Sequence, residues 1–115
     1  MKKIINTFGV KLYHTSNPFY RENINIEGLI PKQETWGDAN NSEFNRNLDK
    51  AVFCCIDDPY DNGYNDDIYI IDTKNCPNIF YKDMTINDGK AVYTHEIIDR
   101  KYLKLIKEGD GESLW

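Results

Sequence analysis

The sequence contains few cysteines and no long hydrophobic run. Its three cysteines are an odd number and two of them, Cys54 and Cys55, are adjacent, which is a poor basis for a disulfide framework and fits a reducing compartment. No stretch approaches the roughly 18 consecutive apolar residues of a membrane-spanning helix. Residues 1–10 lack the apolar region of a secretory signal peptide. We therefore expect a cytoplasmic protein without a membrane-spanning segment.

Positive charge is also scarce. The chain has 14 Lys and Arg against 19 Asp and Glu, a net charge of −5, and its arginines are Arg21, Arg46 and Arg100. This balance argues against a general nucleic-acid coat protein but not against an enzyme with one local basic patch. Abundant asparagine, with lysine in excess of arginine, is associated with AT-rich genomes such as those of low-GC bacteria and their phages. At 115 residues and 40% hydrophobic content, the chain is expected to form one domain, residues 1–115.

Short apolar and β-branched runs dominate the pattern and predict a β-rich fold. They predict strands at residues 10–15, 51–56, 68–72, 79–81, 91–98 and 102–106. Their number and spacing favour a small sandwich or a curled sheet.

Three further segments separate or follow these strands. Residues 19–30 fit one or two helical turns or an irregular lead into Gly28–Pro31. Residues 32–49 are polar and rich in asparagine, which predicts a long loop with a possible short helix at 42–48. Residues 108–115 are expected to form a flexible tail, although Leu114 and Trp115 could dock back on the surface.

An acidic segment contains five aspartates between positions 57 and 67. An EF-hand loop beginning at Asp58 would place Tyr60 at the third ligand position and Tyr69 at the twelfth, so that register fails. We therefore predict a solvated acidic loop and no metal site. Cys54 and Cys55 belong to an apolar strand, which favours a structural role over redox or zinc chemistry.

Two histidines lie near predicted strand ends, where binding groups are common. His14 is surrounded by the hydroxyl groups of Tyr13, Thr15 and Ser16. His95 precedes Glu96, a residue type that can act as a general base or stabilise a developing cation. Taken singly, each of these residues is more often an ordinary hydrogen-bonded side chain.

Taken in order, several segments resemble one known family. Leu12–Ser16 followed by Ile26–Pro31 resembles the opening of ADP-ribosyltransferase-fold proteins. These include the RNA 2′-phosphotransferases and the DNA-modifying ADP-ribosyltransferase toxins. Segments 51–55, 68–72 and 91–94 with 97–106 resemble the later strands of that fold, so the resemblance covers nearly the whole chain.

The resemblance implies an α+β, β-rich fold with a split β core. In such a fold two small, roughly perpendicular sheets, accompanied by one or two short helices, hold NAD between them. It also implies that His14 binds NAD, and the neighbouring cofactor-binding positions are Tyr13, Thr15 and Ser16. An aromatic side chain that stacks on the nicotinamide would be Tyr60 or Tyr64.

The same resemblance implies a catalytic carboxylate that stabilises positive charge on the ribose. It places this residue near Lys90 or Ala91, and neither of them is acidic. We therefore assign Glu96, together with His14, as the catalytic pair.

Three interpretations follow from the sequence. The first is an NAD-dependent ADP-ribosyltransferase that modifies a macromolecular target, protein or nucleic acid. The second is a catalytically inactive acidic binding module, for instance a phage or mobile-element inhibitor of a host protein, because a negative surface can occupy a site built for nucleic acid. The third is a small β-rich domain whose resemblance to the family is accidental.

Overall fold

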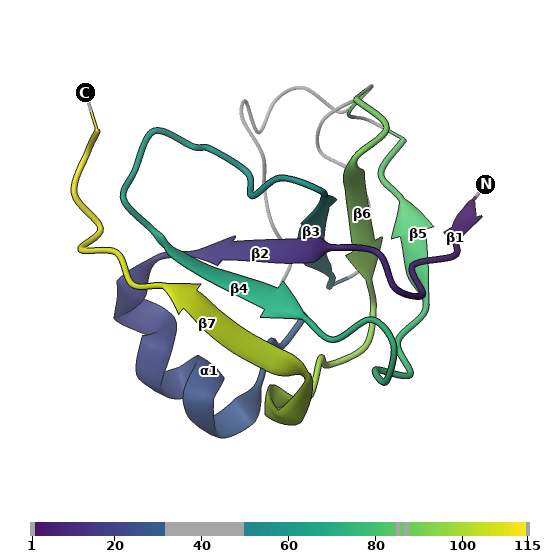
Figure 1. Ribbon diagram of the computed structural model, residues 1–115, viewed down its shortest axis with the longest axis horizontal. Helices are drawn as coiled ribbons and strands as arrows, with labels where there is room; N and C mark the ends of the chain where they lie inside the picture. Colours follow the sequence, from purple (N-terminus) through teal and green to yellow (C-terminus); the bar gives the residue numbers. More distant parts are fainter. Residues whose placement is uncertain (1, 32–49, 85, 87, 115) are drawn as a thin grey trace.

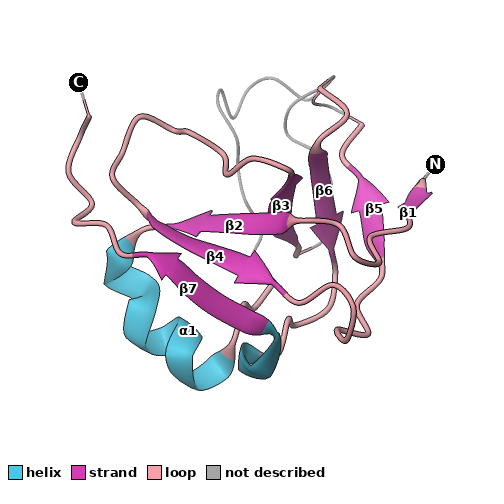
Figure 2. Cartoon of the chain, viewed as in Figure 1, coloured by secondary structure: helices cyan, strands magenta, loops and turns pink. Residues whose placement is uncertain are grey.

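The computed structural model describes residues 2–31, 50–84, 86 and 88–114. Figures 1 and 2 show a β-rich α+β fold, as predicted. The strands are β1 (Ile4–Ile5), β2 (Leu12–Ser16), β3 (Val52–Ile56), β4 (Asp67–Ile71), β5 (Phe80–Lys82), β6 (Ala91–Thr94) and β7 (Leu103–Lys107). A 3₁₀ turn at Pro18–Tyr20 continues into α1 (Arg21–Glu27), and a second 3₁₀ turn at Arg100–Tyr102 leads into β7. Within the described residues, no helix is long and apolar enough to cross a bilayer.

All the strand pairs belong to one antiparallel sheet, in the order β1-β5-β6-β3-β2-β4-β7. The prediction of two separate sheets is therefore wrong. Two residue pairs, Leu12 with Ile56 and Tyr13 with Cys55, join β2 to β3 and make the sheet continuous. Figure 1 shows that β3, β6 and β5 nevertheless lie across the direction of β2, β4 and β7. The sheet bends at the short β2–β3 junction.

The hydrophobic core lies between the sheet and α1. Along β4 the buried residues alternate with partly exposed ones, as expected for a strand with one covered face. The segment after α1 closes the core, because Leu29 and Ile98 exchange backbone hydrogen bonds of 2.9 and 3.0 Å. The buried core residues are Leu12, Ile24, Leu29, Val52, Cys54, Tyr69, Ile71, Phe80, Val92 and Ile98.

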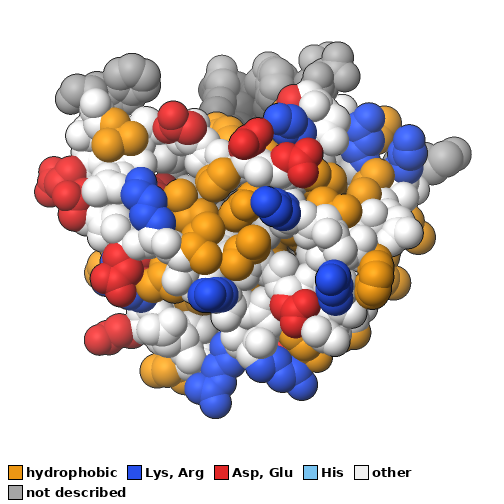
Figure 3. Space-filling model, viewed as in Figure 1, with side chains coloured by type: hydrophobic (Ala, Val, Ile, Leu, Met, Phe, Trp, Pro, Cys, Tyr) orange, Lys and Arg blue, Asp and Glu red, His pale blue; other side chains and the backbone are white. Residues whose placement is uncertain are grey.

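Figure 3 shows the face of β2, β4 and β7 that points away from α1. Hydrophobic side chains lie near its centre, and basic and acidic side chains are interspersed around them. The acidic excess of the sequence is therefore not concentrated on this face.

The acidic segment differs from the predicted solvated loop at its end. Asp57, Asp58 and Asp61 are exposed, but Asp66 is buried and Asp67 is 0% exposed. Asp67 opens β4 and accepts hydrogen bonds from Arg21 and from the backbone N–H of Gly109. Asp67 is therefore a buried and fully paired carboxylate within a run of acidic residues. The neighbouring residues in the sequence do not indicate its burial.

The segment predicted as a flexible tail makes specific contacts over residues 108–114. The backbone of Asn65 donates to Glu112 and accepts from Gly111, both at 2.8 Å. Leu114 donates to Gly63 at 2.8 Å, and Tyr64 forms an isolated bridge with Ser113. These hydrogen bonds hold the end of the chain against residues 63–67.

Of two other predicted segments, one is shorter in the structure and one lies outside the described residues. The predicted strand at 91–98 ends at Thr94, because Asn78 binds the backbone of Glu96 and Ile97 and draws the following segment out of the sheet. The predicted loop at 32–49 and its short helix at 42–48 lie outside the described residues.

Candidate functional site

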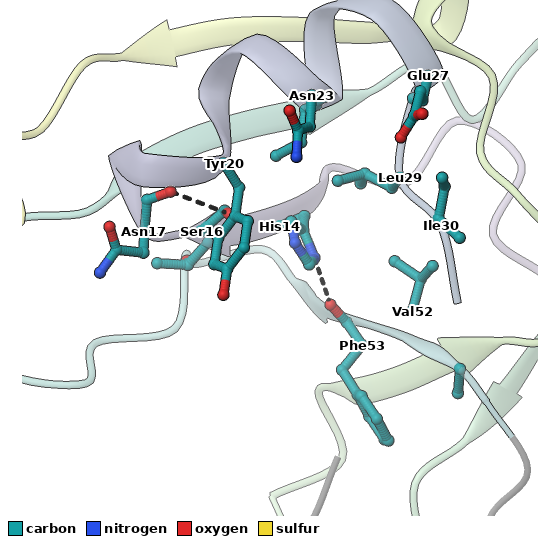
Figure 4. Close-up of a pocket in the computed structure, with 14 residues that line it drawn as sticks. His14, Ser16, Asn17, Tyr20, Asn23, Glu27, Leu29, Ile30, Val52 and Phe53 are labelled. Carbon is teal, nitrogen blue, oxygen red and sulfur yellow. Dashed lines mark hydrogen bonds between the residues drawn. The ribbon is translucent and has the colours of Figure 1, made fainter. Parts of the chain in front are cut away.

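The candidate site begins where β3 separates from β2. β4 pairs with all five residues of β2, whereas β3 pairs only with Leu12 and Tyr13. At the next position the side chain of His14 spans the opening and donates from Nδ1 to the carbonyl oxygen of Phe53, at 2.7 Å (Figure 4). Because a carbonyl oxygen can only accept, Nδ1 carries the proton. The imidazole is thereby held at the point where the sheet opens.

A cavity of about 340 Å³ lies on one side of His14. The end of β2 contributes His14, Thr15 and Ser16, and the start of β3 contributes residues 51–53. The helical segment covers the cavity from the other side (Figure 4). Its lining residues follow helical spacing, so that they share one face of the helix: Tyr20, Asn23, Ile24 and Glu27.

A second cavity of about 270 Å³ shares His14, Thr15 and Phe53 with the first. Its walls also include Tyr13, Cys55 and Tyr60. The Thr15 hydroxyl donates to the carbonyl oxygen of Tyr60 at 3.2 Å and so connects the loop after β3 to the end of β2. Both cavities have volumes within or close to the range of small-molecule sites.

Most of the binding residues expected from the sequence lie around these cavities. Tyr13 and Tyr60 line the second cavity, Ser16 lines the first, and His14 and Thr15 line both. Tyr64 lines neither, because its backbone pairs with Ser113. Of the two tyrosines expected to stack on the nicotinamide, Tyr60 therefore lines a cavity with His14 and Tyr64 does not.

Glu96 lies elsewhere. It is exposed in the loop after β6, where its backbone N–H approaches Thr94 Oγ1 at 3.4 Å and its carbonyl oxygen accepts from Asn78 at 3.2 Å. It lines neither cavity. The structure does not bring Glu96 and His14 together.

Other carboxylates line the two cavities and were not singled out from the sequence. Glu27 lines the first cavity, and Asp83 and Asp88 line the second. Glu27 lies seven residues after Tyr20 in the sequence. This spacing indicates that the two side chains share a face only if residues 18–27 are helical.

The thiols near the site are not activated. Burial raises the pKa of Cys54 and, less strongly, that of Cys55, which lines the second cavity. Both remain protonated at neutral pH, so the nucleophilic thiolate is scarce. Within residues 2–31, 50–84, 86 and 88–114, no group of three His, Cys, Asp or Glu side chains could hold a metal ion.

Comparison with known proteins finds no matching family model, no matching curated protein and no matching solved structure. The function must therefore be argued from the geometry around His14.

Proposed function

We propose that the cavities beside His14 bind NAD and that the chain is an ADP-ribosyltransferase-like protein that transfers ADP-ribose to a macromolecular target. The observation that carries the proposal is the opening between β2 and β3, at which His14 is fixed by its hydrogen bond to Phe53. The family resemblance predicted a ligand at this histidine. The bend in the sheet provides a cavity on each side of it.

The lining fits the parts of NAD by their chemistry. Ribose hydroxyls need hydrogen-bonding partners, and the first cavity offers the Ser16 hydroxyl, the Asn23 amide and the Glu27 carboxylate. The planar bases need aromatic contacts, and Tyr20 lines one cavity and Tyr60 the other. Neither cavity has a lysine or arginine among its described lining residues. Hydroxyl and backbone N–H groups would therefore contact the phosphates there.

The test is NAD binding by the full chain, measured by calorimetry and by thermal shift. The wild-type protein should bind NAD, and His14→Ala should lose that binding. His95→Ala is the matched control, because His95 lines neither cavity. Nicotinamide release is then measured in the presence of protein and nucleic-acid acceptors. This measurement distinguishes ADP-ribose transfer from NAD binding alone. Absence of both a thermal shift and nicotinamide release would overturn the proposal.

A second candidate function is an acidic binding module without catalytic activity. The position of Glu96 outside both cavities favours it, because the expected catalytic pair is not assembled. Exposed Asp57, Asp58 and Asp61 would supply the negative surface for a basic partner.

This candidate predicts a partner whose binding weakens with salt and does not depend on His14. Affinity purification at low salt should recover the same basic protein with wild type and His14→Ala, and high salt should reduce its recovery with both. The triple variant Asp57→Asn, Asp58→Asn, Asp61→Asn should lose it. Recovery that is insensitive to both salt and the triple variant would contradict this role.

A further inference from the structure

Glu27 is the last residue of α1 and lies at the rim of the first cavity. Figure 4 shows its side chain on the helix side of the cavity, with Leu29 between it and His14. Asn23 lines the same cavity one turn earlier. The helix thus places an amide and a carboxylate across the cavity from an imidazole that is itself held by Phe53.

The position of Glu27 is unfavourable for the helix. The last turn of a helix carries partial negative charge, so an acidic side chain there is repelled. The last turn of α1 contains no basic residue. Among the described residues, none forms a hydrogen bond or an ion pair with the Glu27 side chain. The carboxylate therefore has no structural role in the described part of the chain that would compensate for its placement.

The other carboxylates near His14 are accounted for differently. Asp88 accepts hydrogen bonds from the backbone N–H groups of Lys90 and Ala91, at 2.8 and 3.1 Å, and so caps a turn. Asp83 lines the second cavity but is only 1% exposed, so it offers little surface to a ligand. Glu96 lies outside both cavities. Glu27 is the one carboxylate of this described set that is exposed, lines a cavity with His14 and has no described partner.

We propose that Glu27, rather than Glu96, is the catalytic carboxylate of this site, an inference that rests on the proposed NAD-dependent function. In the reaction the glycosidic carbon–nitrogen bond breaks and nicotinamide leaves with the bonding electron pair. A hydroxyl or amine of the acceptor forms the new bond to the ribose carbon and gives up its proton. The negative charge of Glu27 stabilises the positive charge that develops on the ribose, and its carboxylate accepts that proton.

The experiment compares Glu27→Gln with two variants of the same chemistry, Glu96→Gln and Glu22→Gln. Glu22 is exposed in the first turn of α1 and lines neither cavity. For each variant, three quantities are measured: nicotinamide release, NAD affinity and the midpoint of thermal unfolding without ligand. Glutamine keeps the shape of the side chain and removes its charge.

Glu27→Gln should lower nicotinamide release by about 100-fold or more while NAD affinity stays within a few-fold of wild type. Its unfolding midpoint should equal or exceed that of wild type, because a repelled charge is removed from the helix end. Glu22→Gln should release nicotinamide normally and unfold at an equal or slightly lower temperature. Glu96→Gln should release nicotinamide normally.

The outcomes separate the two proposals. Normal release by Glu27→Gln, or a loss of release confined to Glu96→Gln, overturns the role of Glu27 and leaves NAD binding standing. A loss of release by Glu27→Gln that accompanies a lower unfolding midpoint also overturns it, because the residue would then act through stability. Failure of the wild-type protein to bind NAD overturns both proposals.

Discussion

Asp67 accepts hydrogen bonds from two nitrogens of one guanidinium group. Arg21 donates from Nε to Oδ2 and from Nη2 to Oδ1, both at 2.7 Å. Gly109 adds a backbone hydrogen bond to Oδ1 at 2.8 Å, and Arg21 also donates to the Gly109 carbonyl oxygen at 3.0 Å. The pair thereby connects the start of α1, the start of β4 and the segment after β7. Because α1 carries Asn23 and Glu27, this ion pair also positions one wall of the first cavity.

Replacement of Asp67 by asparagine should strongly destabilise the fold. Asp67 is fully buried, and the amide would turn an NH₂ group toward the Arg21 donors. Breaking a buried, hydrogen-bonded ion pair from one side leaves its partner uncompensated. We expect Asp67→Asn to lower the free energy of unfolding by about 3 kcal/mol, measured by urea denaturation.

The matched control is Asp58→Asn. Asp58 pairs with Lys90 at 3.0 Å, but its side chain is 73% exposed. Exposed ion pairs contribute little to stability because water screens them. Equal losses for the two variants would show that burial of Asp67 does not determine its contribution.

The same pair should make the fold sensitive to acid. Burial by itself would raise the pKa of Asp67, but the hydrogen bonds from Arg21 and Gly109 outweigh it and hold the pKa below its ordinary value of 3.8. The unfolded state therefore binds the proton first as the pH falls. The stabilisation that ionised Asp67 provides is fully present above its pKa in the unfolded chain. It is lost as the pH falls through the lower pKa that Asp67 has in the folded protein. The hydrogen bonds that Arg21 donates to Asp67 raise the pKa of Arg21, which stays protonated throughout this range.

Urea denaturation between about pH 6 and pH 2 would measure this dependence. The difference in stability between wild type and Asp67→Asn should be constant at the upper end of the range and shrink below about pH 4. A difference that stays constant down to pH 2 would contradict the assignment.

The parts of the fold that were predictable are those determined by nearby residues. The continuous apolar run at 51–56 and the run at 68–72 predicted β3 and β4, because short runs of apolar and β-branched residues favour strands. His14 was expected at a strand end, and β2 ends two residues beyond it.

The other features depend on residues far apart in the sequence. Two residue pairs between β2 and β3 make the sheet continuous. So short a pairing cannot be predicted from the local sequence pattern. The burial of Asp67 depends on Arg21, 46 positions earlier. Glu27 became a candidate only when the helical register placed it on the same face as Asn23.

Gly28 should tolerate no side chain. It follows α1 with φ of +78°, a left-handed conformation that glycine adopts without strain. A Cβ there would overlap the carbonyl oxygen of Ile98 and lie 2.9 Å from the backbone nitrogen of Arg100. Both backbone strain and steric overlap follow, and we expect Gly28→Ala to lower the free energy of unfolding by about 3 kcal/mol or more.

Gly89→Ala separates these two contributions. Gly89 has a similar φ of +72°, but a Cβ there would meet no atom of the described residues within 4 Å. It should therefore incur only the conformational cost, about 1–2 kcal/mol, by the same thermal or urea unfolding measurement. If Gly28→Ala and Gly89→Ala cost the same, the close approach of the α1 end to the Ile98–Arg100 backbone is not a constraint.

Tyr69 should be replaceable by phenylalanine without loss of stability. Its side chain is 2% exposed, and its hydroxyl has no hydrogen-bond partner in the described part of the chain. An unpaired buried hydroxyl is unfavourable, so Tyr69→Phe should leave the free energy of unfolding unchanged or raise it by about 1 kcal/mol. Tyr102→Phe, at a partly buried tyrosine against the same core, should have no effect.

The advantage of Tyr69→Phe should grow at high pH. Burial raises the pKa of Tyr69 above its ordinary value of 10, so the unfolded state loses the proton first. The stabilisation associated with the protonated hydroxyl is present below the unfolded pKa and is lost as the pH rises through the folded one. Urea denaturation at about pH 8 and about pH 11 should show the wild-type protein losing more stability than Tyr69→Phe. A variant less stable than wild type at both pH values would mean that the Tyr69 hydroxyl has a hydrogen-bond partner.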